Sequence, residues 1–147
     1  MMSKTIGPSF DTTLFVRDNC MCLHVQRAAR ALARRFDEAL KPVGLTNQQF
    51  SLLMSLNRPE PPRMKEVASL LALDRTTLTA NLKPLERRGL VTAKPDPDDA
   101  RSRRLELTGE GRDILVRAVP VWRRTEDEIE NAIGDADRLR VDLRALS

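Results

Sequence analysis

Apolar residues recur every three or four positions along most of this chain, a period typical of amphipathic helices rather than strands. The first such stretch spans about residues 18–41 and includes Met21, Val25 and Leu32, and the sequence KPVG at 41–44 ends it. The same spacing predicts further helices over about 46–56, 64–72, 75–88 and 110–132, and a short closing helix with Leu139, Leu143 and Leu146. Val67, Leu70 and Leu71 are expected to face the core.

Polar residues mark the ends of these helices. Thr46 with Gln49 three positions on forms a capping box, and Asp74 is a good N-cap for the helix of 75–88. Thr108 is the expected cap of the long helix near the C-terminus. Pro84 and Pro120 lie inside predicted helices, where each removes a hydrogen bond and favours a bend.

Two short alternating segments, 90–94 and 103–107, flank the turn-rich sequence PDPDDARS and predict a β-hairpin. Two helices joined by a short turn and followed by a hairpin are the order of a winged helix-turn-helix. The expected fold is therefore mainly α with a small β-hairpin wing. Its parts would be a mobile N-terminal arm over 1–17, dimerisation helices over 18–45 and 110–147, and a winged helix-turn-helix lobe over 46–109.

The charge of the chain is unevenly distributed. The formal net charge is +4, yet residues 1–104 carry 18 Lys or Arg against 11 Asp or Glu, and residues 105–147 carry 7 against 10. A basic N-terminal part and an acidic C-terminal part indicate that one part of the chain binds a polyanion. The alternative is an ordinary solvated charged surface.

Composition excludes several other functions. Aromatic residues are 3% of the chain, too few for a stacking platform for single-stranded nucleic acid. Because no apolar run is long enough for a membrane helix and the N-terminus lacks an apolar signal region, we expect a cytoplasmic protein without membrane contact. One His and two Cys supply neither a metal cluster nor a catalytic triad. With no phosphate loop or nucleophile elbow either, no enzyme activity, metal or cofactor is expected.

The helix of 75–88 carries short polar side chains that can reach base edges in a major groove. The residues expected there are Thr76, Thr77, Thr79, Asn81 and Lys83. The hairpin tip carries Arg101, Arg103 and Arg104, of which Arg101 is expected to enter the minor groove. A bidentate salt bridge from Asp99 would orient Arg101, while Arg75 and Arg103 would contact phosphates.

The stretch over about 20–133 resembles the MarR family of transcriptional regulators. The resemblance is carried by these landmarks: Leu73-Asp74-Arg75, Leu85-Glu86-x-x-Gly89-Leu90-Val91, Asp99-x-Arg101, Leu107-Thr108 and Gly111. Ala80 stands where the family often has a basic residue that contacts bases, which shifts the expected readout toward Thr76, Thr77 and Asn81. Pro84 is a second departure from the family pattern.

The resemblance implies a homodimer that binds double-stranded DNA at a palindromic operator, most often as a repressor. Independently, the predicted terminal helices have more apolar surface than one small lobe covers, which favours a partner; packing within one chain is the alternative. The resemblance also implies a small, often aromatic or phenolic effector between the dimerisation helices and the DNA-binding lobe. Candidate pocket residues, chosen by location and otherwise ordinary core or dimer contacts, are Met21, His24, Phe50, Met54 and Trp122.

Two alternatives remain open at this stage. One branch of the family senses organic hydroperoxides through a cysteine near the start of the first helix, which Cys22 matches in position. This chain lacks tyrosine, so His24 and Arg27 would have to stabilise a thiolate; a buried cysteine that packs as a small hydrophobe is the simpler interpretation. The second alternative is a winged helix that binds a protein instead of DNA. The operator, the regulated genes and the effector do not follow from the sequence.

Overall fold

A computed structural model describes residues 6–147 and divides the chain into two compact units, residues up to 35 and residues 36–147. The first unit holds helix α1 (Phe10–Asn19) and most of α2 (Met21–Leu40). No helix among the described residues is long and apolar enough to cross a membrane.

The N-terminal region differs from the sequence prediction in two ways. The expected mobile arm over 1–17 is helical from Phe10, although residues 1–5 of that arm lie outside the described part of the chain. The helix expected from about 18 begins instead at Met21, because the backbone is extended at Cys20. Ser9 caps α1 by accepting a hydrogen bond from the Thr12 amide. The apolar pattern could not predict α1, because none of its residues is buried.

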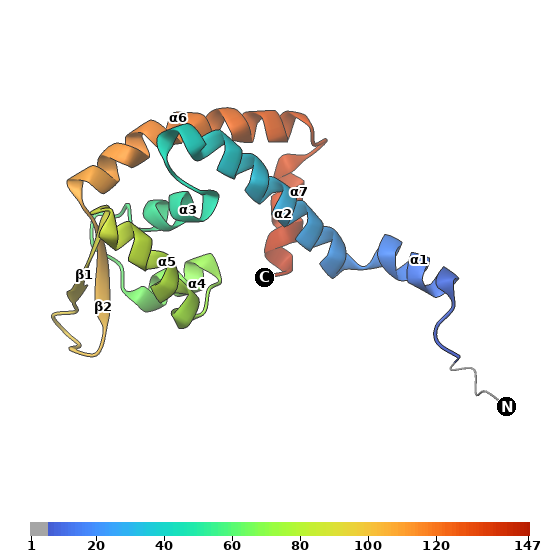
Figure 1. The fold of residues 1–147 in the computed structure, drawn as a ribbon, viewed down its shortest axis with the longest axis horizontal. Coiled ribbons are helices and arrows are strands. Elements are labelled where there is room, and N and C mark those ends of the chain that lie inside the picture. The colour runs from blue at the N-terminus through green and yellow to red at the C-terminus, as the bar shows by residue number, and fades with distance from the viewer. Residues whose placement is uncertain (1–5) are drawn as a thin grey trace. The chain divides into compact units, whose positions relative to one another are not determined.

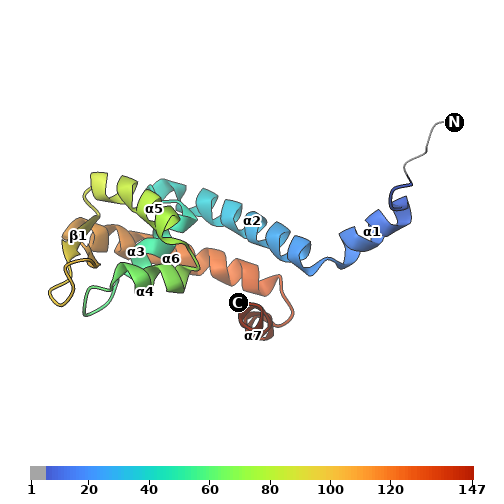
Figure 2. The ribbon, with the colours of Figure 1, turned by 90° about the horizontal axis from the view of Figure 1, so that it is seen from below.

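The second unit contains the lobe with the predicted order of helices and hairpin (Figure 1). After the 3-10 helix η1 (Lys41–Val43), its elements are α3 (Asn47–Ser55), α4 (Met64–Leu71), α5 (Arg75–Arg87), β1 (Val91–Pro95), β2 (Arg103–Leu107), α6 (Gly109–Asn131) and α7 (Ala136–Ala145). Helix α3 contacts α6 on one side and α4 on the other, as both views of the ribbon show (Figures 1 and 2).

The three helix caps predicted at Thr46, Asp74 and Thr108 are confirmed. Thr46 and Gln49 form a complete capping box at α3, Asp74 accepts from the Thr77 amide at 2.7 Å, and Thr108 accepts from the Gly111 amide at 3.0 Å. Each cap satisfies an amide that has no partner inside its own helix. Helices α5 and α6 continue past Pro84 and Pro120, so neither proline ends its helix.

The hairpin is antiparallel and pairs Val91 with Leu107 and Ala93 with Leu105. The proline-rich loop before α4 adds to its edge, because the Leu105 amide donates to the Pro62 carbonyl at 2.9 Å. An isolated bridge between Arg63 and Arg104 extends this contact. The segment predicted only as a loop therefore fixes β2 against the start of α4.

One apolar core joins α3, α4, α5, α6 and the hairpin. The largest side chains with almost no exposure are Leu40, Leu53, Leu78, Leu85, Leu105, Val67 and Val91. The prediction that Leu70 faces the core is wrong, since Leu70 is 61% exposed. Met64 and Val67 already occupy the inward face of α4, with Leu71 packed beside them, and Leu70 is rotated away from that face.

Helix α7 is held to α6 by ion pairs. The Arg140 guanidinium contacts Glu126 at 2.9 Å and also pairs with Glu130. These two carboxylates raise the pKa of Arg140 above its ordinary value.

Candidate DNA-binding surface and ligand pocket

Helix α5 is anchored by one face and leaves the opposite face open. Leu78, Leu82 and Leu85 are buried in the core. The exposed side chains of the helix are Arg75, Thr76, Thr79, Ala80, Lys83, Glu86 and Arg87. The spacing of these positions places polar groups and cations along the solvent side of a helix narrow enough for a major groove.

The structure separates the five predicted major-groove residues. Thr76, Thr79 and Lys83 lie on the exposed face, whereas Thr77 and Asn81 are half-buried at its edge. Thr77 also serves the N-cap, because its amide donates to the Asp74 carboxylate and thereby lowers the pKa of that carboxyl. Sequence reasoning missed the exposed Arg87 as a candidate contact, because it explained this cation as a helix stop signal.

The turn at the hairpin tip is shaped by Asp99, but not through the predicted salt bridge. The Asp99 carboxylate accepts a hydrogen bond from the Arg101 backbone amide at 3.0 Å, and the Asp99 carbonyl accepts from the Ser102 amide. The expectation of a bidentate pair with the Arg101 guanidinium is therefore wrong. This local turn leaves the Arg101 side chain exposed, and Arg103 is exposed at the start of β2.

A buried acid that the sequence did not single out holds the base of the hairpin. The side chain of Asp96 has no solvent exposure and pairs with Arg63 Nε at 2.7 Å and with Arg104 Nε at 3.4 Å. The Asp98 backbone amide also donates to Asp96 at 3.0 Å. That amide, followed by the charges of Arg104 and Arg63, holds the pKa of Asp96 below its ordinary value.

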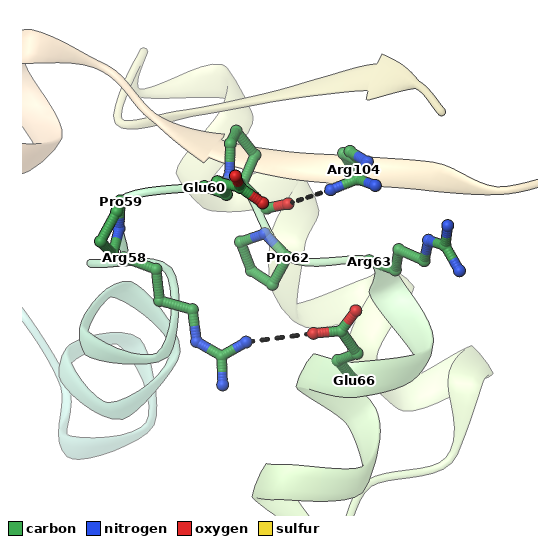
Figure 3. Close-up of a pocket in the computed structure, with 8 residues that line it drawn as sticks. Arg58, Pro59, Glu60, Pro62, Arg63, Glu66 and Arg104 are labelled. Atoms are coloured by element: carbon green, nitrogen blue, oxygen red, sulfur yellow. Dashed lines mark hydrogen bonds and ion pairs between the residues drawn. The ribbon is translucent and has the colours of Figure 1, made fainter. Parts of the chain in front are cut away.

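Arg104 is thus a structural residue, not a tip residue as its sequence position implied. Besides pairing with Asp96, its guanidinium donates to the Pro61 carbonyl at 2.9 Å (Figure 3). A surface cavity of about 630 Å³ lies beside this contact and includes Arg58, Glu60 and Glu66 in its lining. Figure 3 shows Arg58 and Glu66 pairing with one another, so these two charges have partners within the protein.

We predict that Asp96→Asn loosens the hairpin. The change leaves two guanidinium groups at the base of the wing without a counter-charge. The variant should melt at a lower temperature and exchange its hairpin amides faster. Because folding lowers the pKa of Asp96, the stabilisation is present at neutral pH and is lost as the pH falls through the folded pKa. The variant should lack this acid-dependent step.

The control is Asp98→Asn, which changes an exposed side chain two residues away. The melting temperatures of the two variants are compared over a range of pH, and the exchange rates of their hairpin amides are compared at neutral pH. Equal behaviour of the two variants would contradict the structural role of Asp96.

An apolar pocket of about 460 Å³ lies between α3, α4 and α6 and contains three of the five predicted pocket residues. Phe50, Met54 and Trp122 line it, and the rings of Phe50 and Trp122 stack with centroids 6.4 Å apart. Leu70, Leu71 and Val119 complete its apolar wall, and Ser51, Ser55 and Arg123 add polar groups. The exposure of Leu70 is explained by its place in this wall.

The other two predicted pocket residues, Met21 and His24, belong to the first unit, and their contact with a ligand stays a prediction. Met21 is 63% exposed. His24 lines a shallow depression of α2 together with Arg27, Arg30 and Arg34. Its ring Nδ1 lies 2.7 Å from the Cys20 carbonyl oxygen, so the ring is oriented toward the junction between α1 and α2.

Both cysteines are free, and Cys22 is exposed. The simpler interpretation of Cys22 as a buried hydrophobe does not hold for the described chain. The amide of Gln26 lies 3.3 Å from its sulfur and is an uncharged donor. His24, which would have to stabilise a Cys22 thiolate, instead places its ring Nδ1 beside the Cys20 carbonyl oxygen. Reactivity of Cys22 therefore remains a hypothesis.

Comparison with known proteins places this lobe in a family. The model of the MarR family matches residues 45–102. A curated relative, the organic hydroperoxide resistance transcriptional regulator of Bacillus subtilis, is 30% identical over 104 residues and covers 71% of each chain. The HTH-type regulator SarZ of Staphylococcus saprophyticus is 28% identical over 134 residues, covering 91% of this chain and 90% of SarZ.

Solved structures agree. The regulator MosR of M. tuberculosis in complex with DNA is 43% identical with a TM-score of 0.81, covering 87% of this chain and 93% of MosR. The transcriptional repressor CouR bound to a 23-mer DNA duplex is 33% identical with a TM-score of 0.73, covering 86% and 89%. With the exposed face of α5 and the arginine-bearing hairpin, these similarities show that the chain belongs to the MarR family and is a DNA-binding transcriptional regulator, not an enzyme.

Proposed function

We propose that this regulator is a homodimeric repressor that binds a palindromic operator and is released by a small aromatic ligand. The observation that carries the DNA-binding part is the pairing, within one compact unit, of an open polar face on α5 with an exposed arginine at the hairpin tip. A rigid helix and a projecting hairpin of this kind contact the two grooves of a duplex in winged helix proteins. The lobe would span 46–109, with dimerisation helices over 18–45 and 110–147.

The roles of the side chains follow from their exposure. Thr76, Thr79 and Lys83 would face the major groove, with Thr77 and Asn81 at the edge of the contact. Arg101 would enter the minor groove on a turn that Asp99 shapes from within. The remaining exposed cations nearby would contact phosphates: Arg75, Arg87 and Arg103.

A second copy of the chain is proposed because large apolar side chains near both ends are open to solvent. Phe10 and Phe15 of α1 are 72% and 67% exposed, and the apolar residues of α7 follow the same pattern with Val141 at 48% and Leu146, just after its end, at 62%. Exposed apolar surface of this kind marks an interface in soluble proteins. A closed two-fold pair would bring two α5 helices to two half-sites, as a palindrome requires.

The pocket of Phe50, Met54 and Trp122 is the proposed effector site. Its apolar wall and stacked rings suit an aromatic group of a ligand, and Arg123 can form an ion pair with an anionic group of the same ligand. A CouR structure bound to p-coumaroyl-CoA, 31% identical to this chain with a TM-score of 0.76, supports an effector of aromatic type. In one state of the dimer, the spacing of the two α5 helices would not match the two half-sites of the operator. A ligand that binds this state more tightly than the DNA-binding state would lower operator affinity, and the size of the effect is set by the difference between the two ligand affinities.

Redox sensing by Cys22 has weaker support than ligand binding. The name of the Bacillus subtilis relative refers to organic hydroperoxides, and Cys22 is exposed. A reactive thiolate needs a cation or several donors nearby, and within residues 6–147 the contact given for this sulfur is the amide of Gln26. The ligand pocket therefore remains the proposed switch.

Footprinting on the DNA upstream of the protein's own gene tests the function. We expect two protected half-sites related by a two-fold axis, on the same face of the duplex. Affinity for random duplex should also fall steeply with salt, because phosphate contacts release counterions. A protein-binding adaptor would protect nothing and show little salt-dependent binding, and that result would overturn the proposal.

We predict that p-coumaroyl-CoA, used as the probe, quenches the fluorescence of Trp122, the single tryptophan of the chain. Leu70→Lys places a charge in the pocket wall at a position already 61% exposed, so the variant should fold and lose the quenching. Ser69→Lys, an exposed neighbour on the same helix that does not line the pocket, is the matched control. Equal quenching in both variants would move the effector site elsewhere.

A further inference from the structure

Thr79, near the middle of the exposed face of α5, has a hydroxyl group that is already engaged within the helix. Thr79 Oγ1 donates its hydrogen to the Arg75 carbonyl at 2.8 Å. Thr77 is half-buried, and its amide donates to the Asp74 carboxylate at the N-cap. Between these and Lys83 on the exposed face stands Ala80, which has only a methyl group. At Thr79 and Ala80 the exposed face therefore offers methyl groups and no free hydroxyl donor, whereas the exposed Thr76 lies one turn earlier.

This arrangement limits which base edges the middle of the helix can recognise. Guanine presents two acceptors in the major groove, and adenine N7 and thymine O4 are acceptors too. A hydroxyl whose hydrogen is committed to a backbone carbonyl cannot donate to any of them. The thymine C5-methyl group is the one apolar feature of the major groove, and alanine and threonine methyl groups are the side-chain groups suited to contact it.

We infer that Thr79 and Ala80 determine specificity by packing against thymine methyl groups, so that each half-site has T·A pairs at its centre of contact with α5. This inference rests on the proposed placement of α5 in the major groove. Arg75, on one side of the methyl groups, would then secure the helix to the phosphates, and Lys83, on the other side, would stay in the major groove. Recognition of bases by methyl groups at these two positions differs from the sequence prediction, in which polar side chains of α5 reach the base edges.

The test begins with a duplex selected from a random library by the full-length protein, so that no base composition is assumed. Each thymine inside the protected region is then replaced by uracil, which removes only the methyl group. At the thymines facing α5 we expect affinity to fall about fourfold per methyl, the effect of one buried carbon. Uracil outside the protected region should change nothing.

Variants of Thr79 identify the residue responsible. Thr79→Ser keeps the hydroxyl and removes the methyl, so it should bind the thymine duplex about fourfold more weakly and no longer distinguish uracil at one position. Thr79→Val keeps the methyl and removes the hydroxyl, so it should retain the discrimination. Thr13→Ser, at an exposed position of α1, is the control.

The outcomes separate this inference from the proposed function. If the library yields no preferred duplex, the proposed operator binding itself fails. If a duplex is selected and uracil leaves its affinity unchanged throughout, operator binding stands and the thymine readout is overturned. A larger loss with 7-deazaguanine than with uracil would also overturn it, because it would place a guanine at the centre of the contact.

Discussion

Arg101→Ala is expected to weaken operator binding by roughly 1–3 kcal/mol, about five- to 150-fold in dissociation constant at fixed salt. The side chain is exposed at the tip of a turn whose shape depends on the Asp99 carboxylate and the Arg101 amide, not on the guanidinium. Truncation should therefore leave the turn intact and remove only the group that enters the minor groove. Fluorescence anisotropy with the footprinted duplex measures the change.

Arg117→Ala is the control for Arg101→Ala, because it removes a cation that is also exposed but belongs to α6 instead of the hairpin. It corrects for the loss of one positive charge. Arg101→Lys should lie between the wild type and the alanine variant, because it keeps the charge without the planar guanidinium. A dissociation constant unchanged in Arg101→Ala would remove the hairpin from the DNA interface.

Gly111→Ala is expected to lower the free energy of unfolding by roughly 1–3 kcal/mol or more, since a new atom must enter a closed space. A Cβ at this position would lie 2.3 Å from the Leu90 carbonyl oxygen and 3.2 Å from a methyl group of Leu107. Leu90 leads into β1, and its carbonyl also accepts from the Thr108 amide at 3.1 Å. The clash therefore falls where α6 joins the hairpin. Urea unfolding followed by circular dichroism measures the loss.

Gly109→Ala provides a matched comparison two residues earlier in the same helix. A Cβ there meets nothing within 4 Å, so the variant should be as stable as the wild type or slightly more stable. DNA affinity should fall with Gly111→Ala, because the hairpin must shift, and should persist with Gly109→Ala. If both variants unfolded at the same urea concentration, the close approach at Gly111 would be contradicted.

The lobe could be predicted from sequence because its signals are local. A cap such as Asp74 needs only an amide three residues along the chain, and the hairpin needs only two alternating segments and a turn between them. The same periodicity predicted an exposed face of α5, and Thr76, Thr79 and Lys83 are exposed in the structure. Side chains at the margin of that face, Thr77 and Asn81, are half-buried, because a helical period does not resolve where a partially covered edge lies.

Ion pairs between residues far apart in the chain could not be predicted from the sequence. Asp96 has no special pattern, and its burial depends on two arginines, 33 and 8 positions away, that converge on it only after folding. The sequence analysis placed both Arg101 and Arg104 at the hairpin tip, yet Arg104 is bound to Asp96 and Pro61 and Arg101 is open to solvent.

The sequence by itself determined the type and order of the elements in the lobe, because hydrophobic period, caps and turn residues act between neighbours in the chain. The tertiary structure alone decided which side chains keep a free polar group. Asp99 serves a turn, Asp96 joins the hairpin to α4, and Leu70 lines a pocket instead of the core. Each of these three roles depends on which groups surround the side chain after folding, and the pattern of residues along the chain does not specify those groups.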